Sequence, residues 1–209
     1  MIITIDGPSG AGKGTLGKKL SSHLGFSYLD TGLMFRALAY KATITHTPMN
    51  EEALAHLALT LTLEDWDQNA LRTDDMAHVA SQLATYGSVR LAIKQRIQDF
   101  VATNKSPGVI LDGRDMGTVV CPQASKKLFI TASAKIRAQR RFTELQLNGF
   151  TGTLAKVLSD IERRDERDQS RELAPLKPAH DAMVIDTSHL SRTDVFNLAL
   201  NYIQGPDFS

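Results

Sequence analysis

The sequence predicts an α/β fold in three layers, with a five-stranded parallel sheet between layers of helices. Short apolar runs rich in β-branched residues alternate with segments of helical periodicity, and this alternation is typical of open parallel sheets. The runs that predict the strands are Ile2–Ile5, Phe26–Leu29, Val109–Leu111, Lys127–Ile130 and Met183–Ile185. Right-handed crossovers between such strands place ligands at their carboxyl ends.

An aspartate directly follows four of these runs: Asp6, Asp30, Asp112 and Asp186. A carboxylate at the end of a strand either caps the next turn or faces a ligand. Position alone does not separate the two possibilities, so the neighbouring residues have to decide.

The length of 209 residues suits a single globular unit. Because 24 Lys and Arg stand against 23 Asp and Glu, the chain has no general charge to attract nucleic acid or a membrane. The single Cys121 excludes an internal disulfide and a zinc site built from several cysteines. No signal segment or long apolar run is present, so we expect a cytoplasmic protein, and nothing demands more than a monomer.

Two segments depart from the sheet pattern. Residues of about 42–100 are mostly helical and polar in character, and residues of about 140–173 are dense in charge. We expect both to be helical insertions over a core formed by about 1–41, 101–139 and 174–209.

A glycine-rich loop follows the first predicted strand, and the helix after it is predicted by Leu16, Leu20 and Leu24 with a stop at Gly25. Glycines let several backbone N–H groups converge on a phosphate, and the helix N-terminus adds partial positive charge. Lys13 can reach the β- and γ-phosphates of a nucleotide such as ATP. The loop residues are Gly7, Pro8, Ser9, Gly10, Ala11, Gly12, Lys13, Gly14 and Thr15.

The predicted magnesium ligands are Thr15 and Asp112. Asp112 ends an apolar run, where proteins with such loops place the carboxylate that holds Mg²⁺, usually through water. The ion would neutralise charge as a phosphoryl group leaves ATP.

Several motifs resemble bacterial cytidylate kinases. They are Asp6–Thr15, Leu29–Arg36, Asp112–Val120 and Arg164–Leu176, and recognisable motifs lie in every part of the chain except about 43–71. The resemblance implies a P-loop kinase fold with a helical monophosphate-binding flap at about 42–100 and a helical lid at about 140–173. It also implies transfer of the γ-phosphoryl group of ATP to CMP or dCMP.

The resemblance implies that Arg114 contacts the acceptor phosphate, that Asp115 reads cytosine, and that Ser81 and Arg90 make further base contacts. A carboxylate can accept a hydrogen bond from the exocyclic amine of cytosine, whereas uracil presents a carbonyl there. The alternatives for Asp115 are a helix N-cap and an ion pair with Arg114.

Arg36 follows the second strand on a helix and could hold the acceptor phosphate, since a guanidinium matches phosphate oxygens. A surface arginine on an amphipathic helix is the alternative. Thr31 and Phe35 stand where the family has Ser and Tyr, and Thr31 keeps the hydroxyl expected to contact substrate.

The charged segment Glu162–Arg171 places Arg164, Arg167, Asp168 and Arg171 at i, i+3, i+4 and i+7, which is one face of a continuous helix. Such runs are often solvated helix faces. The resemblance implies instead that Arg164 and Arg167 contact the transferring phosphoryl group, Asp168 the acceptor ribose and Arg171 the acceptor phosphate. Arg140 is a further candidate contact of ATP, with a helix-surface role as its alternative.

Two departures from the family affect the acceptor side. Residues 60–72 leave little room for the small sheet that many members carry, and Ala84–Val89 lacks the proline common there. A kinase for another monophosphate such as UMP is an alternative, and so is a P-loop ATPase or switch. Adenylate kinases typically continue the third strand with Asp-Gly-Phe-Pro-Arg, whereas this chain has Asp112-Gly-Arg-Asp-Met.

Overall fold

The structure is a computed structural model that describes residues 1–62, 68–71, 73–147 and 149–205. The chain forms two compact units. The first, which we call the sheet unit, comprises Met1–Leu29 and Ser106–Ser209, and the second, the helical unit, comprises Asp30–Lys105. Each unit is described by itself below.

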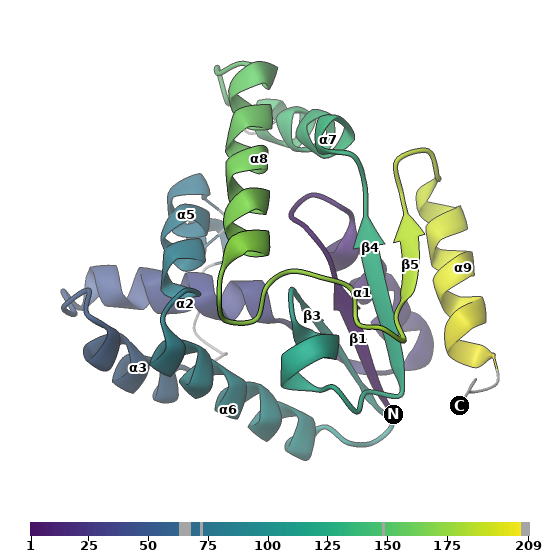
Figure 1. Ribbon diagram of the computed structural model, residues 1–209, viewed down its shortest axis with the longest axis horizontal. Coiled ribbons are helices and arrows are strands. Elements are labelled where there is room, and N and C mark those ends of the chain that lie inside the picture. The colour runs from purple at the N-terminus through teal and green to yellow at the C-terminus, as the bar shows by residue number, and fades with distance from the viewer. Residues whose placement is uncertain (63–67, 72, 148, 206–209) are drawn as a thin grey trace. The chain divides into compact units, whose positions relative to one another are not determined.

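The sheet has five strands in the order β2-β3-β1-β4-β5, so β1 lies at its centre (Figure 1). β1 pairs in parallel with β3 and β4, and β4 pairs in parallel with β5. The predicted strands are confirmed, each within a residue or two of its expected ends. Their bounds are β1 (Ile2–Asp6), β2 (Ser27–Asp30), β3 (Val109–Gly113), β4 (Lys126–Thr131) and β5 (Met183–Asp186).

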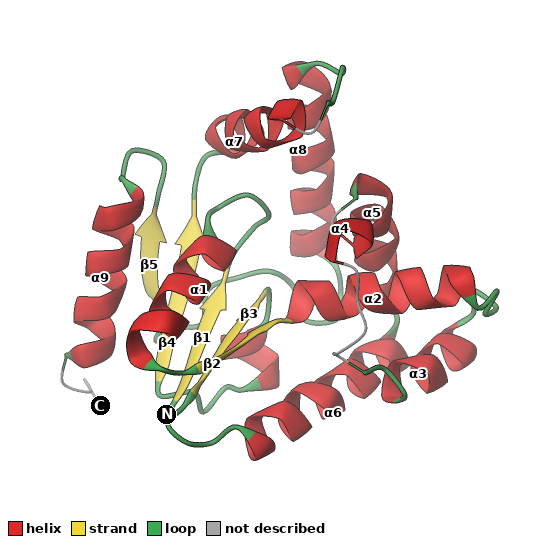
Figure 2. Cartoon of the chain, turned by 180° about the vertical axis from the view of Figure 1, so that it is seen from behind, coloured by secondary structure: helices red, strands yellow, loops and turns green. Residues whose placement is uncertain are grey.

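Two helices of the sheet unit, α1 (Lys13–Leu24) and α9 (Arg192–Gln204), cover one face of the sheet (Figure 2). Leu16 and Leu20 of α1 and Phe196 of α9 join the strands in one hydrophobic core. The predicted leucine face and the stop at Gly25 are therefore confirmed. Because this core holds both α1 and β1, it also fixes the loop that joins them.

The charged segment forms a helical hairpin with its own small core. α7 (Ala134–Leu147) packs against α8 (Leu154–Ser170), with Ala138, Val157 and Ile161 buried between them. Thr153 caps α8 by accepting a hydrogen bond from the backbone N–H of Lys156. The helical character expected for this segment is confirmed, and α7 begins before the expected boundary at residue 140.

The helical unit buries apolar side chains from several of its helices, among them Leu38, Leu54, Leu83 and Ile93. The expected helical character is confirmed for its described residues, whereas residues 63–67 and 72, part of the segment expected to lack a small sheet, lie outside them. None of the chain's described helices is both long enough and apolar enough to cross a membrane. The unit's helices are α2 (Thr31–Ile44), α3 (Glu51–Leu59), α4 (Gln68–Leu71), α5 (Asp74–Leu83) and α6 (Gly87–Thr103).

Lys127 on β4 is a buried cation whose ammonium group lies 2.7 Å from Oδ2 of Asp181, and it also donates to the backbone oxygen of Pro122. We expect Asp181→Ala to lower the free energy of unfolding by about 1–3 kcal/mol, because it leaves a buried cation without its carboxylate. Lys127→Met should cost less, since no unpaired charge remains. Urea denaturation of both variants tests this, and a larger loss for Lys127→Met would contradict it.

Candidate active site

The glycine-rich loop joins the carboxyl end of β1 to α1. Gly7 has a φ angle of 144°, and a side chain there would collide with the backbone oxygen of Ile130, so only glycine fits. The side chain of Lys13 is buried, and its Nζ donates to the backbone oxygen of Pro8 at 2.9 Å. The loop therefore folds back around the ammonium group of Lys13.

Asp112 lies beside this loop, near the end of β3, and is 5% exposed. Its Oδ1 is 4.0 Å from Nζ of Lys13, and its Oδ2 accepts a hydrogen bond of 2.9 Å from the hydroxyl of Tyr28. A Cβ added at Gly14 would lie 3.6 Å from the same Oδ2. The carboxylate thus borders the residue before Thr15, whose own side chain is exposed. Sequence reasoning paired Asp112 with the loop but did not single out Tyr28.

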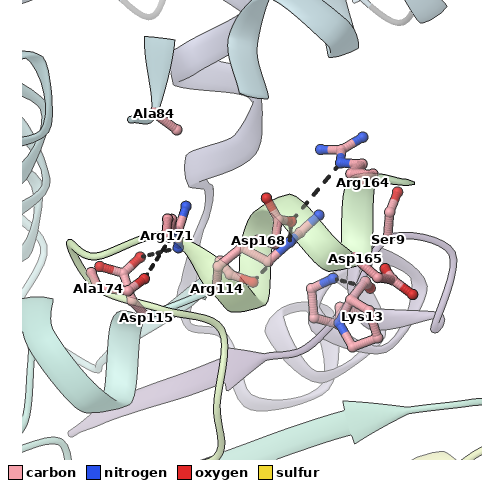
Figure 3. Close-up of polar contacts among 12 residues, drawn as sticks. Ser9, Lys13, Ala84, Arg114, Asp115, Arg164, Asp165, Asp168, Arg171 and Ala174 are labelled. Atoms are coloured by element: carbon pink, nitrogen blue, oxygen red, sulfur yellow. Dashed lines mark hydrogen bonds and ion pairs between the residues drawn. The ribbon is translucent and has the colours of Figure 1, made fainter. Parts of the chain in front are cut away.

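A cluster of arginines and buried carboxylates connects the end of β3 to α8 (Figure 3). Nε of Arg114 donates to Oδ2 of Asp168 at 3.1 Å, and Nε of Arg164 lies 4.0 Å from the same oxygen. Nη2 of Arg171 lies 3.9 Å from Oδ1 of Asp115. Asp168 and Asp115 are 5% and 4% exposed. The structure therefore brings together five of the residues predicted for the acceptor side and the lid.

The charge of Asp168 is set by this cluster. Burial alone would raise its pKa, but Arg114, Arg164 and Arg171 outweigh burial and hold the pKa below its ordinary value. Asp168 is consequently ionised at neutral pH. It can keep accepting hydrogen bonds from the arginines and from a ligand hydroxyl.

The predicted helical face of the charged segment is wrong at Arg171. α8 ends at Ser170, and Arg171 has an extended backbone with φ of −63° and ψ of 137°. Its Nε donates to the backbone oxygen of Ala174 at 2.7 Å, so the chain turns back at this point. Arg171 still reaches Asp115, but from the segment after α8. Asp115 makes no side-chain cap to the short π-helix η1 (Met116–Val120), which disfavours the N-cap alternative.

Arg137 on α7 is a residue of the site that sequence reasoning missed. It is 4% exposed, and it donates from Nε to Ala132 O at 2.8 Å and from Nη1 to Ser9 O at 3.2 Å. Both Nη atoms also donate to the carboxylate of Asp165 on α8. Arg137 therefore ties the glycine-rich loop to the helix that carries Arg164. No local pattern could have paired it with a carboxylate 28 residues away.

Arg140, also on α7, is anchored beside the loop. It donates to the hydroxyl of Thr187 at 2.9 Å and to the backbone oxygen of Thr187 at 2.6 Å, and the Thr187 hydroxyl donates to Ala11 O at 3.0 Å. The guanidinium is thus anchored, but Arg140 is an exposed residue, so a helix-surface role stays the alternative. Arg167 lies on α8 and is half-buried.

The remaining predicted residues belong to the helical unit. Nη1 of Arg36 on α2 donates to Leu71 O at 3.1 Å, and Nη1 of Arg90 on α6 donates to Ala84 O at 3.3 Å. Thr31 at the start of α2 and Ser81 on α5 are 3% and 7% exposed. Arg36 is thus half-buried and hydrogen-bonded within its unit, unlike a solvated surface arginine.

Comparison with known proteins places nearly all of the chain in one family. A sequence model described as cytidylate kinase matches residues 3–205. Cytidylate kinase 1 of Haemophilus influenzae is 46% identical over 219 aligned residues, which cover 98% of this chain and 94% of that protein. The cytidylate kinase of Paramagnetospirillum magneticum is 47% identical, with 97% of each covered. A solved structure of a shikimate kinase from Bacteroides thetaiotaomicron is 12% identical and superposes with a TM-score of 0.50, over 98% of this chain and 96% of that chain. This similarity shows a common fold alone.

Proposed function

The chain belongs to the cytidylate kinase family, and from that premise we propose that it transfers the γ-phosphoryl group of ATP to CMP or dCMP. The products are ADP and either CDP or dCDP. The observation that carries the proposal is the pairing of Arg114 and Arg164 around buried Asp168, in the same unit as the glycine-rich loop. Phosphoryl transfer depends mainly on positioning and on stabilising charge, and such cations supply both.

On the donor side, the loop 7–15 holds the phosphates of ATP through its backbone amides and Lys13. Lys13 already lies within the loop, at 2.9 Å from Pro8 O. We also assign Arg140 to ATP, because it is anchored on Thr187, whose hydroxyl donates to Ala11 O of the loop.

The residues present fit a magnesium ion. Thr15 and Asp112 offer a hydroxyl and a carboxylate, the hard oxygen ligands that Mg²⁺ prefers, and Asp112 lies against the backbone that leads to Thr15. When bound, Mg²⁺ would neutralise charge on the β- and γ-phosphates.

On the acceptor side, we assign the phosphate of CMP to Arg36, Arg114 and Arg171, and the ribose hydroxyls to Asp168. Arg164 and Arg167 stabilise the charge on the phosphoryl group in transfer. The base is assigned to Asp115, Ser81 and Arg90, and Thr31 is assigned to the substrate through its hydroxyl. The ionised state of Asp168 supports its role, because a carboxylate accepts from hydroxyls.

The assignment of Asp115 predicts the base preference. We expect Asp115→Asn to reduce the ratio of kcat/KM for CMP over UMP by about ten- to a hundredfold, because an amide can donate to the uracil carbonyl that a carboxylate repels. Steady-state assays with both acceptors measure the ratio, in which any general loss cancels. Asp160→Asn, on the exposed side of α8, is the matched control and should leave the ratio unchanged. An unchanged ratio in Asp115→Asn would remove Asp115 from base reading.

The proposal also covers the location, oligomeric state and partners of the enzyme. We propose a cytoplasmic monomer whose partners are the small molecules ATP, CMP and dCMP, and size-exclusion chromatography tests the monomer. The competing activities are a kinase for UMP or another monophosphate, and a P-loop ATPase. ADP formation measured with CMP, dCMP, UMP, AMP and GMP, and with no acceptor, separates them. We expect rapid turnover only with CMP and dCMP.

A further inference from the structure

Asp6 is a buried carboxylate to which the proposed reaction gives no role. It ends β1 immediately before the glycine-rich loop and is 4% exposed. Its Oδ1 accepts a hydrogen bond from the backbone N–H of Met116 at 2.9 Å, and its Oδ2 accepts one from that of Gly117 at 2.7 Å. These amides open η1 and directly follow Arg114 and Asp115.

Asp6 thereby holds the Arg114–Asp115 segment at both of its ends. On the side before Arg114, the backbone of Asp6 is in register with Gly113 in the β1–β3 ladder. On the side after Asp115, the carboxylate of Asp6 accepts hydrogen bonds from the first two backbone amides of η1. The two residues between these attachments have little freedom to move along the edge of the sheet.

Gly117 shows how closely η1 lies against β1. A Cβ added there would be 2.9 Å from Oγ1 of Thr4, 3.2 Å from Cδ of Lys127 and 3.4 Å from Oδ2 of Asp6. The contact with Thr4 is too short for a real Cβ, so a side chain at this position would push η1 away from β1. The hydrogen bonds and the packing therefore fix the same turn.

Stability alone does not explain a carboxylate in this place. Burial raises the pKa of Asp6 to about 7, and Asp115 adds to the rise, while the amides of Gly117 and Met116 and the charge of Lys13 oppose it. Keeping the group ionised in the fold therefore costs folding free energy. Such costs concentrate at functional sites, where geometry matters more than stability.

We propose that Asp6 is a positioning residue that sets the orientation of Arg114 and Asp115, and through them the affinity for the acceptor and the choice of base. The inference rests on the proposed function, because it requires Arg114 and Asp115 to contact the acceptor. Asp6 reaches Arg114 and Asp115 through the backbone of residues 113–117. Its loss should therefore affect the acceptor far more than ATP.

The test is Asp6→Asn, assayed at pH 8.5, where the carboxylate of the unaltered protein is ionised. Asparagine has one acceptor oxygen, so its NH₂ group would oppose one of the two amides and shift the turn. We expect KM for CMP to rise about tenfold or more and the CMP over UMP ratio of kcat/KM to fall about tenfold, with KM for ATP changed less than about twofold. Equal rises in both KM values with an unchanged ratio would make Asp6 merely structural and overturn the inference.

Two further measurements protect the test against a folding defect. Ile203→Ala, a core change on α9, should lower the melting temperature without changing the base ratio, and so reports what general destabilisation does. Gly117→Ala pushes the same turn away from β1 while keeping the carboxylate of Asp6. If Asp6→Asn does not fold, the acceptor kinetics of Gly117→Ala are measured instead. A Gly117→Ala enzyme with unaltered KM for CMP and unaltered base ratio would overturn the inference.

The unaltered protein is assayed in parallel to separate the two proposals. If it does not phosphorylate CMP, the proposed function fails, and the inference fails with it. If it phosphorylates CMP and Asp6→Asn keeps the same acceptor kinetics, only the inference about Asp6 fails.

Discussion

Replacing Arg114 with methionine is expected to lower kcat/KM for CMP by about 10²- to 10³-fold and to leave ATP affinity almost unchanged. The change removes a cation that pairs with Asp168 at 3.1 Å and that we assign to the acceptor phosphate. Loss of one preorganised donor to transition-state charge typically costs about this much. Arg114 makes no contribution to the loop 7–15 in our assignment, which is why ATP binding should survive. Steady-state kinetics and calorimetric titration with ATP measure the two quantities.

The matched control for Arg114→Met is Arg163→Met. Arg163 lies on α8 next to Arg164, but its side chain is 64% exposed and pairs only loosely with Asp160 at 3.9 Å. Its replacement should change kcat/KM by less than about twofold, since exposed ion pairs contribute little. A comparable loss of ATP affinity in Arg114→Met would show that Arg114 holds the fold of the site instead of the acceptor.

The second large effect is expected at Arg137. We expect Arg137→Met to lower the free energy of unfolding by about 3–5 kcal/mol. The carboxylate of Asp165 is largely buried, and the substitution removes the cation that pairs with it. It also removes donors from the backbone oxygens of Ser9 and Ala132. For a chain of this size the loss corresponds to a melting temperature lower by about 10 °C. Denaturant titration and thermal unfolding measure it.

A double-mutant cycle separates the ion pair from the packing around it. Arg137→Met combined with Asp165→Leu should be more stable than Arg137→Met alone, because no unpaired charge remains in the site. Losses that simply add would contradict a coupling between Arg137 and Asp165. The loop would then be tied to α8 by packing alone.

The strands of this fold could be predicted because buried parallel strands appear in a sequence as short continuous apolar runs. α1 could be predicted for a similar local reason, since its leucines repeat at helical spacing and a glycine follows. The end of α8 could not. The charge periodicity continues through Arg171, but the chain leaves the helix after Ser170 and turns through Ala174, which has a φ of 52°.

Within the candidate site, residues that belong to a motif could be singled out from the sequence, whereas the long-range contacts that hold them in place could not. Lys13, Asp112 and Arg114 belong to runs that are recognisable by themselves, and the structure brings each into a charged cluster of the sheet unit. The contacts of Asp6 with η1 span 110 and 111 residues, and that of Arg137 with Asp165 spans 28. Such pairs are decided by tertiary packing, which has no local signature.

In the proposed reaction the γ-phosphoryl group leaves ATP for the phosphate of a cytidine nucleotide. The most direct measurement follows ATP labelled in its γ-phosphate, incubated with the protein, magnesium and CMP, and identifies the labelled product by chromatography. We expect the label to appear in CDP, in amounts equal to the ADP formed, and little of it to be released without CMP. Label released as inorganic phosphate at the same rate with or without CMP would contradict it and would indicate an ATPase.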